Sequence, residues 1–229
     1  MNQIFNMENP FWTFVNKMAD ILVLEIFWVF TSIPLVTIGA SSAAYWHCIL
    51  RIVDGKEGHI YSEYFREFKR SFMTGTAVWF IHLAAGLFIV FDIWVCFQIK
   101  QNYAGFLLGS FCVMALFYLM ISTYVYPLVG HHHFGVKKVI GNSVFLMLRH
   151  LPHSFSMVLI SALAAAGAAY FGSFWVVMLL PLAASYLNGK LLMWIFSQYE
   201  EKEDEPDGEE LSDIVDRIES IGREPEEKL

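Results

Sequence analysis

The chain has 229 residues, of which 56% are apolar and 16% are charged, and its formal net charge is −7. Soluble globular domains are nearer a quarter charged, so the composition excludes an ordinary soluble domain and favours a membrane protein. The acidity is local: residues 200–229 carry a net −10 and residues 1–199 a net +3. We expect a lipid bilayer as partner and no nucleic acid.

Six apolar stretches divide the chain and predict membrane-spanning helices. They cover residues 11–33, 38–53, 72–99, 103–126, 154–171 and 174–196. A bilayer core needs about 20 helical residues, so the second stretch, Ile38–Val53, is short and could also be a re-entrant half-span. Pro34 and Gly39 predict a tight turn outside the membrane before that stretch, which favours six full spans. In the fifth stretch, the small residues of Ala162–Ala169 predict close helix packing.

The basic residues predict the orientation of these spans. Of the 15 Lys and Arg residues, 13 lie in the terminal segments, in alternate gaps or, for Lys17 and Arg51, in the adjoining end of an apolar stretch. Only Lys100 lies in an intervening gap, and Lys190 lies inside the last stretch. Since positive residues stay cytoplasmic, we expect a multi-pass protein of the plasma membrane with both termini inside. The predicted fold is an all-α, polytopic transmembrane bundle of six spans.

Two cytoplasmic gaps contain further helical patterns, at residues 60–72 and 136–147. In each, apolar residues recur at helical spacing with basic residues on the opposite face, which is typical of amphipathic helices at a membrane interface. Both patterns are compatible with a surface-lying elbow and with a docking helix for a partner. The candidate docking face of the first helix consists of Tyr64, Phe65, Phe68 and Phe72.

Ionisable and polar residues inside the spans are costly in a bilayer and therefore informative. Glu25 lies near the middle of the first span, and Asp20 and Lys190 lie at a similar depth, where they could pair. The candidate intramembrane polar network is Asp20, Glu25, Lys190, Asn188, His47 and Asp92. Such residues either face a wet solute or proton site or act as buried polar staples between helices, and the sequence leaves both open.

Catalytic and metal-binding patterns are weak. The run His131–His133 would point its rings in different directions on a helix and has no nearby Cys or carboxylate to complete a metal site. Cys48, Cys96 and Cys112 occur singly, without metal or disulfide spacing. We expect no catalytic residue, no cofactor and no metal, and a non-enzymatic protein.

The last 30 residues form a separate region of the predicted organisation. Residues 1–199 are the transmembrane domain, and residues 200–229 are an acidic cytoplasmic tail. Within the tail, Leu211, Ile214, Val215 and Ile218 predict a short amphipathic helix at residues 210–221.

Several motifs resemble the YesL family of bacterial integral membrane proteins over about residues 5–196. They are Asn16–Asp20, Pro34–Ser41, Glu57–Gly58, Phe65–Phe72, Tyr126–Pro127, Asn142 and Arg149–Pro152. The signature residues are Asn16, Asp20, Pro34, Thr37, Gly39, Ser41, Asn142 and Pro152. The resemblance implies a polytopic membrane protein, often encoded beside carbohydrate-uptake transporters, in a family without an established biochemical activity.

Two functions follow from these observations. The first is an accessory or scaffold protein linked to carbohydrate uptake, with a carbohydrate ABC transporter permease as the partner that the resemblance suggests. The second is a small-solute or proton-coupled transporter or channel that uses the carboxylates inside its spans. The sequence favours the accessory function.

Overall fold

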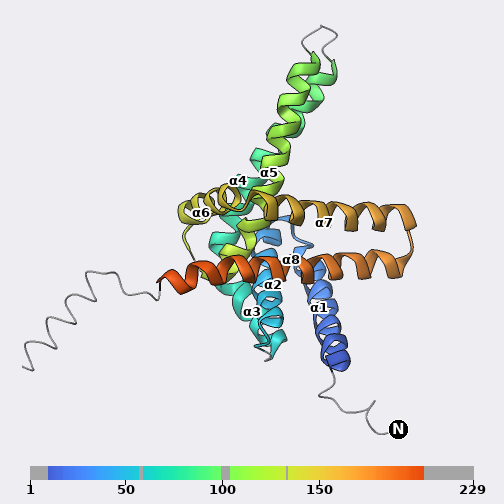
Figure 1. The fold of residues 1–229 in the computed structure, drawn as a ribbon, viewed down its shortest axis with the longest axis vertical. Helices are drawn as coiled ribbons and strands as arrows, with labels where there is room; N and C mark the ends of the chain where they lie inside the picture. Colours follow the sequence, from blue (N-terminus) through green and yellow to red (C-terminus); the bar gives the residue numbers. More distant parts are fainter. Residues whose placement is uncertain (1–9, 57–58, 99–103, 133, 204–229) are drawn as a thin grey trace, which may run out of the picture. The chain divides into compact units, whose positions relative to one another are not determined.

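The computed structural model describes residues 10–56, 59–98, 104–132 and 134–203. In this part of the chain the fold is entirely helical, which confirms the all-α prediction (Figure 1). The chain divides into two compact units, residues 1–193 and residues 194–229. Only the last residues of one helix are described in the second unit.

The helices correspond to the predicted elements. Each apolar stretch and each short amphipathic pattern matches one helix, and a short 3₁₀ helix, η1, occupies the predicted turn. The predicted tail helix at residues 210–221 lies outside the described residues. The helices are α1 (Pro10–Ser32), η1 (Leu35–Thr37), α2 (Ile38–Val53), α3 (Ile60–Arg70), α4 (Phe72–Gln98), α5 (Ala104–His132), α6 (Val136–Arg149), α7 (Leu151–Phe171) and α8 (Phe174–Glu203).

Four helices in the described part of the chain are long and apolar enough to cross a membrane, where six spans were expected. They lie in α4, α5, α7 and α8, at residues 72–98, 105–132, 151–171 and 176–199. The first helix, α1, carries three ionisable residues, Lys17, Asp20 and Glu25. The second, α2, has 16 residues, about 24 Å at 1.5 Å per residue, which is shorter than a bilayer core. The four helices are those of a membrane protein.

Helix α2 lies at the centre of the first unit, in contact with α1, α3, α4 and α5. Its small residues allow neighbouring backbones to come very close. A Cβ atom added to Gly39 would lie 2.1 Å from the carbonyl oxygen of Gly75 on α4. One added to Gly130 on α5 would lie 2.4 Å from the carbonyl oxygen of Ala43. Close packing is clearest on α2. Within Ala162–Ala169 most residues are exposed and only residue 164 is buried, but a Cβ atom added to Gly167 would lie 2.7 Å from Leu180 Cδ1 on α8.

Hydroxyl groups close the turn between α1 and α2. Thr37 Oγ1 donates to the carbonyl oxygens of Thr31, at 2.5 Å, and Pro34, at 2.7 Å. Ser41 Oγ in turn donates to the Thr37 carbonyl oxygen at 2.9 Å. The turn predicted from Pro34 and Gly39 is therefore present, and the Thr37 hydroxyl satisfies a carbonyl that the end of α1 leaves open.

Helix α3 lies along α1 and α2. Its Tyr64 hydroxyl is 2.6 Å from Thr31 Oγ1 at the end of α1, and the Phe65 ring is 5.5 Å from the Phe27 ring. The chain thus returns to the level of the α1–α2 turn before α4 begins, and there Gly39 meets Gly75. Six consecutive spans would place those two helix starts on opposite sides of the bilayer, so their contact does not fit the predicted order of spans.

Helices α4 and α5 run side by side (Figure 1). Tyr118 of α5 donates a hydrogen bond to the His82 carbonyl oxygen on α4 at 3.0 Å, and the rings of the two residues stack 4.4 Å apart. The His82 ring also lies 2.9 Å from Ser122 Oγ through Nε2. The two helices are therefore linked by contacts of His82 on α4 with Tyr118 and Ser122 on α5.

Candidate functional site: a cavity around Glu25

A cavity of about 370 Å³ lies between α1, α2, α5 and α8, within the first unit. Its wall combines four aromatic residues, one carboxylate and two serines with apolar side chains. Among the described residues that line it, none is Lys, Arg or His, and Glu25 supplies the formal charge. The polar and aromatic residues of the wall are Glu25, Trp28, Ser42, Tyr45, Trp46, Tyr126 and Ser185.

Two side-chain hydrogen bonds hold the helices around this cavity. Trp28 Nε1 on α1 donates to Ser42 Oγ on α2 at 3.1 Å. Tyr45 on α2 donates its hydroxyl to Ser185 Oγ on α8 at 2.8 Å. Glu25 precedes Trp28 by three residues, which places both side chains on one face of α1. The wall is therefore assembled from groups that already bond to one another across helices.

Two polar atoms in the wall remain unsatisfied. Glu25 Oε1 and the Tyr126 hydroxyl oxygen are buried and have no hydrogen-bond partner among the described residues. The Tyr45 hydroxyl is a hydrogen-bonding neighbour of the Glu25 carboxylate but leaves that oxygen unsatisfied. A buried polar group without a partner costs about 1–3 kcal/mol. Since both atoms belong to the wall of one cavity, a bound ligand could satisfy both.

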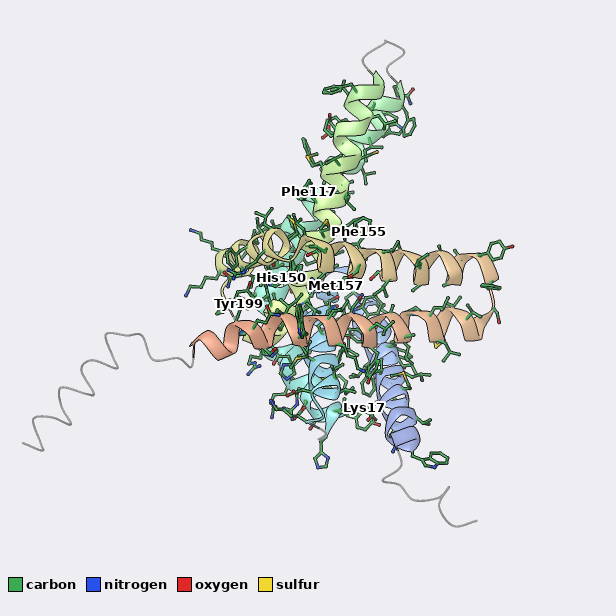
Figure 2. The ribbon with its side chains drawn as sticks, viewed as in Figure 1. Lys17, Phe117, His150, Phe155, Met157 and Tyr199 are labelled. Atoms are coloured by element: carbon green, nitrogen blue, oxygen red, sulfur yellow. The ribbon has the colours of Figure 1, made fainter. Side chains whose placement is uncertain are left out.

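A second cavity of about 390 Å³ shares Trp46 with the first. Its polar wall includes Ser161 and Asn188, and Asn188 Nδ2 donates to Ser161 Oγ at 2.9 Å. Asn188 Oδ1 is buried and has no partner among the described residues. Met157 of α7, labelled in Figure 2, is fully buried and lines this cavity. The described residues that line the second cavity carry no charge, and they include no group suited to catalysis.

The predicted pair between Asp20 and Lys190 is not seen. The Lys190 ammonium lies over the ring of Tyr186, 4.8 Å from its centroid. The ion pairs within the described residues include none between Lys190 and Asp20.

The other members of the predicted polar network also lie apart. His47 Nδ1 is 2.8 Å from the Gly130 carbonyl oxygen, which fixes α2 against α5. Asp92 lies on α4, its Oδ2 is buried, and no described residue hydrogen-bonds to that atom. Asp92 lines neither the Glu25 cavity nor the Asn188 cavity. His47 and Asp92 therefore lie outside the wall of the Glu25 cavity.

The predicted docking face of α3 divides into a buried and an exposed part. Tyr64 has no exposed surface and belongs to the core between α1, α2 and α3. Phe65 and Phe72 are 45% and 37% exposed, and Phe68 is half-buried. Glu67 lies on the side of α3 opposite these rings in the sequence pattern, yet it is buried and bonds to Ser71 and Arg70. The Glu67 carboxylate can be buried because Arg70, in the last turn of α3, and Ser71, the next residue, both bond to it.

The signature residues have mainly structural positions. Pro34, Thr37 and Ser41 form the α1–α2 turn, and Gly39 makes the contact with α4. Three others are exposed, at positions 16, 142 and 152. These residues shape the α1–α2 turn and its contact with α4, and they are not among the residues that line the cavity.

Sequence reasoning found Glu25 but missed the rest of its cavity. No sequence pattern singled out Trp28, Tyr45, Trp46 or Ser185, and Tyr126 appeared only in the motif Tyr126–Pro127. A partial signal exists, because Ser42 and Tyr45 are three residues apart on α2 and so share a face, as Glu25 and Trp28 do on α1. That α5 and α8 complete the wall follows only from the tertiary structure.

Comparison with known proteins gives two matches. The family model described as "Protein of unknown function, DUF624" matches residues 21–93. The chain is also 24% identical over 169 residues to "Uncharacterized protein YesL" of Bacillus subtilis (strain 168), which covers 73% of this chain and 76% of that protein. No solved structure matches the chain. The matched region 21–93 includes Glu25, Trp28, Ser42, Tyr45 and Trp46, and the turn between α1 and α2.

Proposed function

The domain match and the similarity to YesL assign this chain to the YesL family, and on that premise we propose that it is a non-enzymatic membrane protein that binds a small solute in the Glu25 cavity for passage across the bilayer. One observation carries the proposal. Glu25 Oε1 and the Tyr126 hydroxyl, from helices far apart in the sequence, are both buried, both unsatisfied and both in the wall of one cavity.

A purely structural role for Glu25 accounts less well for this arrangement. A polar staple gains its stability by pairing across helices, as Trp28 does with Ser42 and Tyr45 with Ser185. The Glu25 carboxylate has Tyr45 of α2 as a neighbour, but its Oε1 atom has no partner among the described residues, and buried polar atoms without partners are rare enough to require an explanation. A cavity with a few convergent polar groups in an otherwise apolar wall is the usual form of a small-molecule site.

The proposed topology has four spans, α4, α5, α7 and α8, with both termini cytoplasmic in the plasma membrane. Helices α1 and α2, which supply much of the cavity wall, then lie on the cytoplasmic side, so that the cavity is where a solute enters or leaves the spans. This topology keeps the same 13 basic residues inside as six spans would, because only the turn at residues 33–37 changes sides and that turn carries no charge. The contact between Gly39 and Gly75 supports it, since α2 and α4 then begin on the same side.

A flux assay tests the proposed function. Proteoliposomes of the purified protein would be placed in iso-osmolar polyol, sugar, amino-acid and alkylammonium solutions, and swelling followed by light scattering. We expect at least one solute to enter faster than in protein-free vesicles. Glu25→Gln should abolish that entry, and Asp92→Asn, which changes a carboxylate outside the cavity, should retain it. Equal loss in both variants, or no entry of any solute, would refute the proposal.

The accessory function is the second candidate, and the exposed aromatic surface near α3 favours it. Tyr61, Phe65 and Phe72 are 50%, 45% and 37% exposed, and the resemblance suggests a carbohydrate ABC transporter permease as partner. Replacing Phe65 and Phe72 together with Ala should release a permease that co-purifies in mild detergent. Phe106→Ala, which removes an exposed ring from α5, is the matched control and should leave the complex intact.

A further inference from the structure

The Glu25 cavity places one carboxylate among four aromatic side chains, and we infer from this geometry that its ligand is a small organic cation of the alkylammonium class. The inference rests on the proposed function and names the chemistry of the solute. It depends on three features of the cavity, which are its charge, its aromatic wall and its unsatisfied hydroxyl.

The charge of the wall is unbalanced. Two other partly or fully buried carboxylates have arginine partners: Glu63 lies 3.0 Å from Arg51, and Glu67 pairs with Arg70. Glu25 faces no Lys, Arg or His among the described residues of its cavity. A buried carboxylate left without a counter-charge is strongly unfavourable, whereas a ligand with a positive charge would provide one. An anionic ligand would add a second negative charge to the same site.

The aromatic residues suit an alkylated cation in particular. Trp28, Tyr45, Trp46 and Tyr126 come from three helices and line the same space. A cation within about 6 Å of an aromatic ring is attracted by the electrons of the ring face, and methylated ammonium groups are held in this way. Lys190 above Tyr186 shows the same interaction elsewhere in this chain. A strongly hydrated metal ion would gain little from such a wall.

The unsatisfied Tyr126 hydroxyl and the size of the cavity further restrict which cations fit. Tyr126 can donate or accept one hydrogen bond, so a cation that carries its own hydroxyl would satisfy it while its ammonium group faces Glu25. The volume of about 370 Å³ lies at the small end of the range of about 300–1,000 Å³ found for ligand sites. A hydroxyalkylammonium ion such as choline has these features and is a suitable probe.

The test compares choline with 3,3-dimethylbutan-1-ol, an uncharged molecule of the same shape. Binding to the full-length protein in detergent would be measured by isothermal titration calorimetry and by the change in intrinsic tryptophan fluorescence, to which Trp28 and Trp46 of the cavity wall contribute. We expect choline to bind the wild type and the neutral isostere to bind at least tenfold more weakly. Glu25→Gln should weaken choline binding at least tenfold, and Asp92→Asn should leave it unchanged, with thermal unfolding confirming that both variants fold.

Other outcomes separate this inference from the proposed function. If the isostere binds as well as choline, or if glucose or glycerol binds and choline does not, the cation class is refuted while a solute-binding cavity stands. If Glu25 only exchanges a proton, with a carboxyl infrared band that titrates and no heat from any probe, the inference is also refuted. If no probe binds and no solute enters vesicles, both proposals fail together.

Discussion

The contact between α2 and α4 predicts a strong effect of a very small substitution, Gly39→Ala. The added methyl group would lie 2.1 Å from the Gly75 carbonyl oxygen, 2.7 Å from the Gly75 carbonyl carbon and 2.7 Å from Trp79 Cβ. Two of these three atoms belong to the backbone, so a change of rotamer cannot remove the clash. The added methyl group and the Gly75 carbonyl oxygen must move from 2.1 Å to at least 3.4 Å apart to restore an ordinary contact distance, so the two helices must separate by more than an ångström.

The size of the effect follows from opposing terms. Alanine in a helix is favoured over glycine by about 0.5–1 kcal/mol, whereas inserting a methylene into a packed core costs about 1–3 kcal/mol, and more when the backbone must move. We therefore expect Gly39→Ala to lower the free energy of unfolding by about 2 kcal/mol. Gly109→Ala on α5 is the matched control, because no described atom lies within 4 Å of its added Cβ, and it should be neutral or slightly stabilising.

Thermal unfolding in detergent, followed by circular dichroism, measures both variants against the wild type. Gly39→Ala should melt at a clearly lower temperature and Gly109→Ala at the same or a higher one. If Gly39→Ala melts with the wild type, α2 and α4 do not approach each other as described. The four-span topology would then lose its main support, which is that contact.

Three further predictions concern the topology, the α6–α7 junction and helix α3. With the three native cysteines replaced, Leu35→Cys should react with an impermeant maleimide only after permeabilisation, while Ser173→Cys reacts from outside; external labelling of Leu35→Cys would restore six spans. Burial lowers the pKa of His150, labelled in Figure 2, and nearby positive charges lower it further. Because the pKa is lowered, the unfolded chain binds more protons than the folded chain near pH 6, so the free energy of unfolding falls as the pH falls from 7.5 to 5. His150→Gln should reduce that loss, as measured by thermal melts at the two pH values. Tyr64→Phe removes the hydrogen bond to Thr31 and should cost about 0.5–1.5 kcal/mol of unfolding free energy in urea titrations; an unchanged midpoint would contradict that contact.

The positions of the helices could be predicted because the signals for them are local. Apolar residues at helical spacing and a proline–glycine turn determine where helices begin and end, and α2 has the predicted bounds, Ile38–Val53. The same local signals could not show which apolar helices face lipid. Helix α2 resembles a short span in composition, yet its small residues place it at the centre of the first unit, where α4 and α5 enclose it.

The burial of polar groups was predicted less well. Glu67 lies on the polar side of the α3 pattern, and periodicity alone assigns it to solvent, but Ser71 and Arg70 satisfy it in the interior. For Asp20 and Lys190, similar depth suggested a pair, whereas the Lys190 ammonium lies over the ring of Tyr186. Depth along a helix axis says nothing of the direction of a side chain around that axis.

The sequence by itself determined that this is a helical membrane protein and singled out Glu25 as a costly residue, because hydropathy and helix periodicity act over neighbouring residues. Only the tertiary structure decided what surrounds that carboxylate. Tyr126 and Ser185 reach the cavity from α5 and α8, 101 and 160 positions along the chain from Glu25. Their approach depends on how whole helices pack, and helix packing is set by the joint fit of many distant side chains, which no local pattern contains.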